Sequence, residues 1–150
     1  MTEFKTLNLS PILIESLNDA GFIKTSPIQE LTLDTILAGK DVFAQAETGS
    51  GKTGAFAIPL TEIFLRAIKE NESANTDMNY IVLSPTRELA QQTHNFFIEL
   101  GKKTKIKSVC IIGGENIEKQ RKVIQEGVTV LVATPGRICD LIKQKIVNIS

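Results

Sequence analysis

The sequence has little of what marks disulfide-bonded, metal-binding or membrane-spanning proteins. Its 150 residues include two cysteines, one histidine, one tyrosine and no tryptophan. Cys110 and Cys139 form no Cys-x-x-Cys pair and lie in apolar surroundings, so we expect buried, reduced thiols rather than a disulfide or a metal site. No apolar run approaches the roughly 20 residues that a membrane-spanning helix needs. These absences favour a cytoplasmic protein with no part in a membrane.

The chain also lacks an excess of charge of either sign. Seventeen Lys and Arg residues balance seventeen Asp and Glu residues. A protein that holds nucleic acid by bulk charge is usually basic. Any nucleic-acid binding must therefore come from a few locally placed donors, and we expect it to be weak for this chain alone. With 42% apolar and 23% charged residues, the composition is that of one compact soluble domain.

Strand-like and helix-like segments alternate along most of the chain. Two short helices are expected first, from Pro11 to a stop at Gly21 and from Pro27 to near Gly39, each after a serine N-cap. The expected strands are continuous apolar runs, at residues 42–44, 80–83, 109–112 and 128–133. The helices that follow them are expected at residues 52–69, 87–100, 115–126 and 137–143, with an exposed loop at 70–77.

This order of elements predicts an α/β fold, with a parallel sheet covered by helices on both faces. Thr86 is the expected N-cap of the helix at 87–100, and Gly101 its expected stop. Ligands of such folds bind beyond the carboxyl ends of the strands. The loops after the four strands are therefore expected to share one edge of the sheet, which would be the functional face.

The segment after the first expected strand has the composition of a phosphate-binding loop. Residues 46–53, Ala-Glu-Thr-Gly-Ser-Gly-Lys-Thr, match the pattern G-x-x-x-x-G-K-[ST], except that alanine replaces the first glycine. Lys52 is expected to reach the β- and γ-phosphates, and the hydroxyl of Thr53 to ligate Mg²⁺. A Gly/Ser-rich turn without a ligand is the alternative. The residues expected to hold the phosphates are Ala46, Thr48, Gly49, Ser50, Gly51, Lys52, Thr53 and Gly54.

Residues 21–29, Gly-Phe-Ile-Lys-Thr-Ser-Pro-Ile-Gln, resemble the Q motif that precedes the phosphate loop in DEAD-box helicases. Gln29 carries both a donor and an acceptor, which match the N6 and N7 edge of adenine. In that family an aromatic residue upstream of the motif stacks on adenine, and Phe4 stands in its place. Thr25 and Ser26 stand where the family usually has proline and threonine, and smaller contacts are expected from them. The resemblance implies ATP rather than GTP.

Three further loops resemble other motifs of the same family. Residues 85–90 (Pro-Thr-Arg-Glu-Leu-Ala) are similar to motif Ia, residues 134–137 (Thr-Pro-Gly-Arg) to motif Ib, and residues 113–114 to the double glycine between them. Helix N-termini, threonine hydroxyls and arginines can hold a sugar–phosphate backbone without reading bases. The expected RNA contacts are Pro85, Thr86, Arg87, Gly113, Gly114, Thr134, Gly136 and Arg137. Taken singly, the same residues can be helix caps, a turn and surface arginines.

Together these motifs identify the chain as similar to the N-terminal RecA-like P-loop NTPase domain of a DEAD-box ATP-dependent RNA helicase. The resemblance implies ATP hydrolysis coupled to local unwinding of RNA, with ATP and Mg²⁺ as cofactors. One domain is expected over residues 1–150, truncated before the Asp-Glu-Ala-Asp motif that supplies the hydrolytic carboxylates. The second RecA-like domain, a partner in the full-length enzyme, would also be absent. Missing strands would leave an exposed sheet edge.

The chain alone is thus expected to be a monomer that binds ATP or ADP, and RNA weakly, without efficient hydrolysis. Lys52 and Thr53 are its expected catalytic residues. Two alternatives stay open: a stand-alone, non-catalytic adenine-nucleotide or RNA-binding module, and a small P-loop kinase or unrelated ATPase. A kinase would have no use for Gln29 and Phe4, or for the Pro-Thr-Arg and Thr-Pro-Gly-Arg loops.

Overall fold

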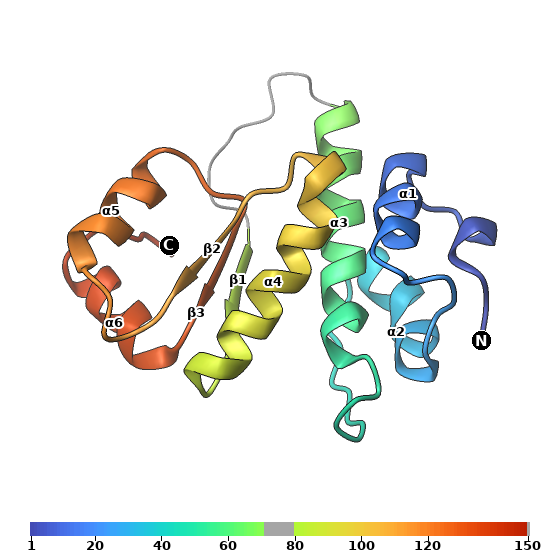
Figure 1. Cartoon of the computed structure of the whole chain (residues 1–150), viewed down its shortest axis with the longest axis horizontal. Coiled ribbons are helices and arrows are strands. Elements are labelled where there is room, and N and C mark those ends of the chain that lie inside the picture. The colour runs from blue at the N-terminus through green and yellow to red at the C-terminus, as the bar shows by residue number, and fades with distance from the viewer. Residues whose placement is uncertain (71–79, 150) are drawn as a thin grey trace. The chain divides into compact units, whose positions relative to one another are not determined.

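The computed structural model describes residues 1–70 and 80–149, which belong to two compact units. Unit 1 contains residues 1–70 and 99–106, and unit 2 contains residues 80–98 and 107–149. From residue 71 on, the loop expected at 70–77 lies outside the described residues. Figure 1 labels the helices and strands of both units.

Unit 1 is helical. A short 3-10 helix, η1 (Phe4–Thr6), precedes α1 (Pro11–Asp19), α2 (Pro27–Leu37) and α3 (Lys52–Glu70). The two short helices start at the expected prolines, and Gly21 and Gly39 follow them with positive φ, as predicted. α3 continues through Pro59 as one helix and packs along α2 (Figure 1). The apolar core of this unit includes Phe4, Leu13, Leu17, Ala57 and Ile58.

Unit 2 contains a parallel sheet of three strands, β1 (Tyr80–Leu83), β2 (Ser108–Ile111) and β3 (Val130–Ala133), in the order β1-β3-β2. α4 (Arg87–Thr104), whose last turn belongs to unit 1, connects β1 to β2, and α5 (Ile117–Gln125) connects β2 to β3. α6 (Pro135–Lys143) follows β3 directly. All four residues of β3 are buried, as expected for the central strand of a covered parallel sheet.

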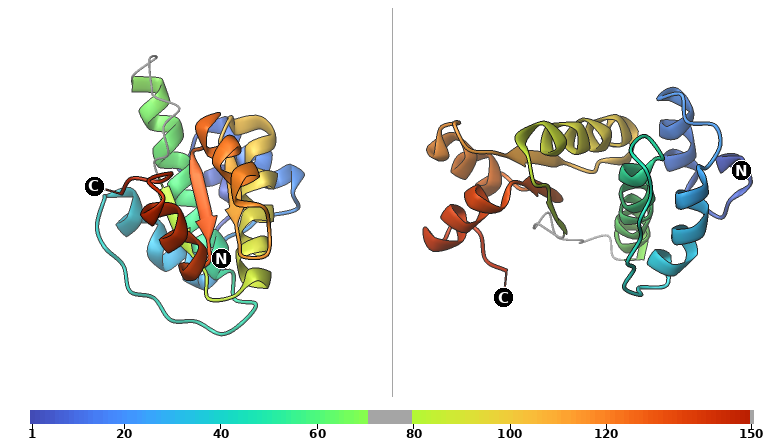
Figure 2. Two further views of the ribbon diagram at one scale, coloured as in Figure 1. Left: turned by 90° about the vertical axis from the view of Figure 1, so that its left-hand side faces the viewer. Right: turned by 90° about the horizontal axis from the view of Figure 1, so that it is seen from below.

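Helices cover both faces of this sheet. α5 and α6 lie on one side of the strands and the first part of α4 on the other (Figures 1 and 2). On the α4 side, Nδ1 of His94 lies 2.9 Å from the hydroxyl of Ser108 in β2. The apolar core on the α5 and α6 side consists of Ile111, Val128, Leu131, Ala133, Ile138, Leu141 and Val147. The predicted α/β fold with a parallel sheet is thus confirmed.

The prediction of a strand at residues 42–44 is wrong. This segment has no regular secondary structure, and the side chains of Val42 and Phe43 are 39% and 97% exposed. A short apolar run becomes a strand only when a neighbouring strand satisfies its backbone N–H and C=O groups. The described sheet contains only β1, β3 and β2. Three strands, rather than four, therefore lead into the candidate loops.

The predicted stop of the fourth helix at Gly101 is also wrong. α4 continues to Thr104, and Lys105 takes the left-handed conformation with φ of 63°. A Cβ atom on Gly101 would lie 2.6 Å from the carbonyl oxygen of Ile106, so this glycine lets the returning chain cross the helix closely. No helix in the described part of the chain has the length and apolar content to span a membrane.

Candidate nucleotide and nucleic-acid sites

Three loops at the carboxyl ends of the strands surround one groove in unit 2. Leu83 of β1 and Ile111 of β2 both pair with Ala133 of β3, so the three strands end at the same level. The groove has a volume of about 600 Å³. Its lining residues are Pro85, Thr86, Arg87, Gly113, Thr134, Gly136, Arg137 and Asp140. The parallel register thus brings together all but one of the residues expected to contact RNA.

The remaining expected residue, Gly114, lies against the guanidinium group of Arg87. Its φ is +87°, and a Cβ atom there would lie 3.2 Å from Nη1 of Arg87 and 3.6 Å from Cζ. A side chain at this position would therefore strain the backbone and press on the guanidinium group. The double glycine therefore leaves room for the guanidinium group of Arg87, and its contact with a ligand backbone stays a prediction.

The groove presents several hydrogen-bond donors. The hydroxyl of Thr86 accepts the N–H of Leu89 at 3.2 Å, so Thr86 is the predicted N-cap of α4 and its O–H can still donate. Thr134 precedes α6, yet its hydroxyl makes no cap hydrogen bond. Arg137 donates from Nη2 to the carbonyl oxygen of Glu115 at 3.3 Å, which leaves its other N–H groups for a ligand. These groups suit an anionic backbone.

Asp140 is a groove residue that sequence reasoning missed. It lies three residues after Arg137 on α6, and side chains three residues apart share a helix face, so this spacing could have indicated it. Its side chain is exposed and adds a negative charge to the groove. A carboxylate only accepts hydrogen bonds, so it can face a hydroxyl group of a ligand but repels a phosphate.

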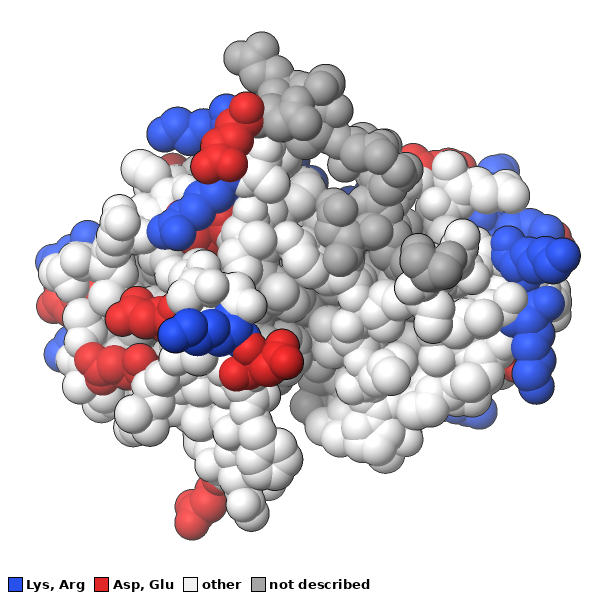
Figure 3. Space-filling view, turned by 180° about the vertical axis from the view of Figure 1, so that it is seen from behind, with Lys and Arg blue, Asp and Glu red and all other residues white. Residues whose placement is uncertain are grey.

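The surface charge of unit 1 is mixed. On the face shown in Figure 3, basic and acidic side chains of this unit are interspersed. Within unit 1, Lys103 bonds to both Glu15 and Asp19 of α1, at 2.6 and 2.7 Å. The described ion pairs of Lys103 thus neutralise part of the basic charge of unit 1. That nucleic acid is held by a few placed donors such as Arg87 and Arg137 stays a prediction.

The expected phosphate loop is a tight turn ahead of α3. Gly49 and Gly51 have φ of +82° and +89°, values that other residues rarely adopt. Ser50 donates its N–H to the carbonyl oxygen of Glu47 at 3.2 Å, and its hydroxyl is buried without a hydrogen-bond partner among the described residues. Such an atom is unusual in a folded protein. Because a phosphate oxygen would satisfy it, the loop fits a phosphate ligand.

Lys52 is the first residue of α3. The first hydrogen bond of the helix runs from the N–H of Ala55 to the carbonyl oxygen of Gly51 at 3.1 Å, so the N–H groups of residues 52–54 have no helical partner. Such a helix N-terminus attracts anions. The ammonium group of Lys52 donates to the carbonyl oxygen of Ala46 at 2.7 Å. It thus lies across the loop that phosphates would enter.

Gln29 joins α2 to the phosphate loop. Its Oε1 accepts the N–H of Ser26 at 3.0 Å, and its Nε2 donates to the carbonyl oxygen of Gly51 at 3.1 Å. A primary amide has two N–H donors and two acceptor lone pairs, so one of each remains for a ligand. A side chain on Gly54 would overlap the amide of Gln29, which explains the need for a small residue there. The hydroxyl of Ser26 has no described partner.

Phe4 and Thr25 lie inside unit 1 rather than at its surface. Both are 1% exposed, and the N–H of Phe4 donates to the carbonyl oxygen of Ile23 at 2.9 Å. The hydroxyl of Thr25 accepts the N–H of Thr2 at 2.9 Å and donates to its carbonyl oxygen at 3.2 Å. Its only donor is therefore used, and the ring of Phe4 has to be uncovered before it can stack on a base. Both ligand contacts stay predictions.

An apolar cavity lies beside the same loop in unit 1. It has a volume of about 310 Å³, and its lining residues are Ile28, Thr32, Ile36, Val42, Ala44, Lys52, Ala55 and Phe56. The phosphate loop and this cavity belong to unit 1, whereas the groove belongs to unit 2. The expectation that all the loops share one edge therefore holds for the three loops of unit 2 and stays a prediction for the phosphate loop.

Neither cysteine is in a disulfide, and the expectation of two buried thiols is wrong for Cys139, which is exposed. Its neighbour Ile138 points into the core, so the next position of α6 faces outward. Burial raises the pKa of the half-buried Cys110 thiol. Among the described residues, no cluster of three or more His, Cys, Asp or Glu side chains could hold a metal ion.

Comparison with known proteins places the chain among helicases. Residues 26–150 match the family described as DEAD/DEAH box helicase. The chain is 41% identical over 142 residues to the DEAD-box ATP-dependent RNA helicase RhpA of Helicobacter pylori, covering 95% of this chain and 27% of that protein. It is 43% identical over 143 residues to CshA of Streptococcus pneumoniae, covering 95% of this chain and 26% of that protein.

Solved structures show the same likeness. A DEAD box protein from the hyperthermophile Methanococcus jannaschii is 35% identical, with a TM-score of 0.84 over 99% of this chain and 39% of that chain. An ATP-dependent RNA helicase from Sulfolobus tokodaii, described as hypothetical, is 30% identical, with a TM-score of 0.79. The chain spans about a quarter of the length of the curated relatives it matches. With its RecA-like α/β fold and a family match over residues 26–150, the chain belongs to the DEAD/DEAH box helicase family.

Proposed function

We propose that this chain is the adenine-nucleotide- and RNA-binding N-terminal part of an ATP-dependent RNA helicase. The observation that carries the proposal is the groove of unit 2, because three loops far apart in the sequence line it with the donors that a sugar–phosphate backbone requires. The relatives RhpA and CshA are named as ATP-dependent RNA helicases, which supports the same conclusion. The activity, substrate and partners of the whole protein are part of this proposal.

The protein would contact the sugar–phosphate backbone of RNA and would not recognise its bases. Arg87 and Arg137 supply charged N–H donors, and Thr86 and Thr134 supply hydroxyls from the starts of α4 and α6. Contacts with phosphate and sugar carry no sequence information. We therefore expect affinity for RNA that falls with salt and does not depend on sequence.

ATP or ADP would be held in unit 1. The N–H groups at the start of α3, the ammonium group of Lys52 and the unpartnered hydroxyl of Ser50 would bind the phosphates, and the spare donor and acceptor of Gln29 would bind adenine. The cavity beside the loop offers apolar surface for the base, and the ring of Phe4, which is 1% exposed, would stack on the base only once it is uncovered. Adenine is therefore expected to bind in preference to guanine.

Mg²⁺ would be held by the hydroxyl of Thr53 together with phosphate oxygens, because this ion prefers oxygen ligands and is bound through few protein groups. When bound, it would neutralise charge on the phosphates. Thr53 is half-buried in the first turn of α3, next to the residue that carries the ammonium group.

Hydrolysis requires more than these residues. The 150 residues contain no Asp-Glu-Ala-Asp sequence, so the chain supplies neither the aspartate for Mg²⁺ nor the glutamate for the attacking water. We expect the chain alone, a monomer, to bind ADP or ATP without hydrolysing ATP at a useful rate. A second RecA-like domain would be its partner in the full-length protein.

The test compares RNA-stimulated ATP hydrolysis by the longest natural form of the protein with that of the 150-residue chain. The long form is expected to hydrolyse ATP faster with RNA, whereas the short chain binds ADP and leaves ATP intact. If the longest natural form shows no RNA-stimulated hydrolysis, the proposal is wrong and a non-catalytic binding module replaces it.

A further inference from the structure

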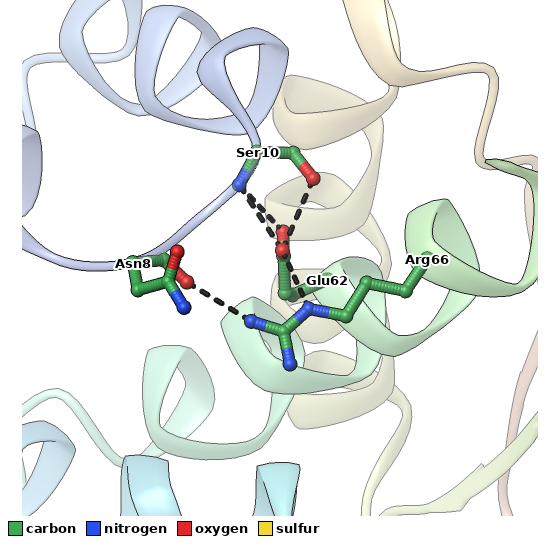
Figure 4. A network of polar contacts seen from close by, with 4 residues as sticks. All are labelled: Asn8, Ser10, Glu62 and Arg66. Atoms are coloured by element: carbon green, nitrogen blue, oxygen red, sulfur yellow. Dashed lines mark hydrogen bonds and ion pairs between the residues drawn. The ribbon is translucent and has the colours of Figure 1, made fainter.

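Glu62 is a buried carboxylate in the middle of α3 (Figure 4). It is 2% exposed, and a buried charge is costly unless it is paired and hydrogen-bonded. Its oxygens accept the N–H of Ser10 at 2.9 and 3.1 Å, the hydroxyl of Ser10 at 3.0 Å and Nε of Arg66 at 3.0 Å. Arg66 also donates from Nη2 to the carbonyl oxygen of Asn8 at 2.9 Å. The pair therefore holds residues 8–10 against α3.

This contact takes the place of an N-terminal cap for α1. Ser10 is the N-cap residue of α1, but its side chain makes no hydrogen bond to that helix. Its hydroxyl points to Glu62 instead (Figure 4). The negative charge of Glu62 thus lies at the positive end of the α1 dipole, where it is favourable. Replacing the carboxylate would leave the start of α1 and the guanidinium group of Arg66 without their partner.

The other end of the same N-terminal segment is attached to the Q motif. The N–H of Thr25 donates to the carbonyl oxygen of Thr2 at 2.8 Å, and the N–H of Phe4 donates to the carbonyl oxygen of Ile23 at 2.9 Å. The segment of residues 2–10 is therefore fixed at two points, on the Q motif and on α3. Phe4 takes part in the attachment to the Q motif and lies six residues before Ser10, which is attached to α3.

We propose that Glu62 and Arg66 are positioning residues for adenine recognition, because they hold the segment of Phe4 and its Q-motif partners in register with α3. Glu62 follows Lys52 by ten residues, which is about 15 Å along a helix, so it acts without touching the nucleotide. The inference rests on the proposed binding of an adenine nucleotide in unit 1. It adds a cause for the placement of the Phe4 segment, whereas Gln29 is held by Gly51 of the phosphate loop.

The first test compares ADP, GDP and inorganic pyrophosphate binding to the wild type, Glu62→Gln and Glu118→Gln. The glutamine keeps the size of Glu62 but loses its charge and turns an N–H donor toward Ser10. ADP affinity is expected to fall about tenfold, with loss of preference over GDP, whereas pyrophosphate affinity stays within about twofold. The control, Glu118→Gln, removes an equal charge from α5, where the Glu118 carboxylate is exposed and lies 3.4 Å from Nε of Arg121. It should change none of the three affinities.

A parallel fall in the affinities for ADP, GDP and pyrophosphate, or an unchanged ratio of ADP to GDP affinity, would overturn the positioning role. If Glu62→Gln does not fold, Arg66→Gln replaces it, because the side chain of Arg66 is 42% exposed and its loss removes one partner only. The same selective loss for ADP, of smaller size, is expected from that variant.

The second test needs no nucleotide and separates the two proposals. Hydrogen exchange of the amides of Phe4 and Thr25, which are bonded to Ile23 and Thr2, is expected to be faster in Glu62→Gln than in the wild type or in Glu118→Gln. Unchanged exchange at both amides would refute the positioning role alone. If wild-type protein binds neither ADP nor pyrophosphate, the proposed function fails instead.

Discussion

Gln29 donates a hydrogen bond from its side-chain amide to the carbonyl oxygen of Gly51 across 3.1 Å. The residue expected to read the base is therefore also attached to the loop expected to hold the phosphates, 22 positions further along the chain. Gly51 also accepts the first helical hydrogen bond of α3, from Ala55. The conformation of the loop and the orientation of Gln29 thus depend on each other.

Substitution of Gln29 by alanine is expected to reduce ADP affinity at least about tenfold and to remove the preference for ADP over GDP. The variant loses both the adenine pair and the restraint on Gly51. Titration calorimetry of the wild type, Gln29→Ala and a control, Gln92→Ala on the exposed side of α4, checks this. Equal affinity of the wild type for ADP and GDP would contradict the adenine assignment.

Lys52→Ala is expected to abolish the phosphate-dependent part of nucleotide binding, with a loss of ADP affinity of about tenfold or more. Little change in Tm is expected, because the hydrogen bond from Lys52 to Ala46 is exposed. Lys69→Ala, at the other end of α3, removes an equal charge and serves as the control. Unchanged ADP or ATP affinity in Lys52→Ala would rule out the phosphate role.

Arg137→Ala in the longest natural form is expected to weaken RNA binding alike for all sequences. Loss of one phosphate contact should also reduce the slope of log affinity against log salt concentration by about one. Fluorescence anisotropy with several unrelated single strands, at several salt concentrations, measures both effects. Lys143→Ala, at the end of the same helix, is the control. A loss confined to particular sequences would show that Arg137 reads bases.

The single histidine makes stability depend on pH. Burial lowers the pKa of His94 below its usual value of about 6.5, which the unfolded chain retains. The unfolded state therefore binds the proton more readily, and stability from this group is present above pH about 6.5 and lost as pH falls below it. Thermal unfolding between pH 7 and pH 5 is expected to show a smaller drop in Tm for His94→Gln than for the wild type. Equal drops would exclude this linkage.

Truncation of two phenylalanines in the 150-residue chain is expected to lower the free energy of unfolding by very different amounts. Phe97→Ala removes a side chain that is 0% exposed and should cost about 3–5 kcal/mol of unfolding free energy. Phe43→Ala removes a side chain that is 97% exposed and should cost less than about 0.5 kcal/mol. Urea unfolding of both variants checks the prediction. A large loss in Phe43→Ala would show that residues 42–44 are packed after all.

Features that depend on residues close together in the sequence could be predicted. The helix starts after Ser10, Ser26 and Thr86 follow from N-cap residues and proline, which act within one turn. The succession of β1, β2 and β3 along the chain followed from apolar runs separated by helices. The end of α4 was missed, because it depends on the packing of Ile106 against Gly101 and not on the glycine alone. The strand predicted at 42–44 is not formed, because an apolar run becomes a strand only when a neighbouring strand pairs with it.

The residue types and spacings of the phosphate loop, the Q motif and the three groove loops could be read directly from the chain, since each motif occupies a short stretch. Their assembly could not. Asp140 lines the groove because α6 follows β3, and β3 pairs in parallel register with β1 and β2. The contact of Glu62 with Ser10 joins positions 52 residues apart, and no periodicity signals a buried ion pair that caps another helix. Local backbone preferences act over a few residues, whereas such contacts form only when whole elements pack together.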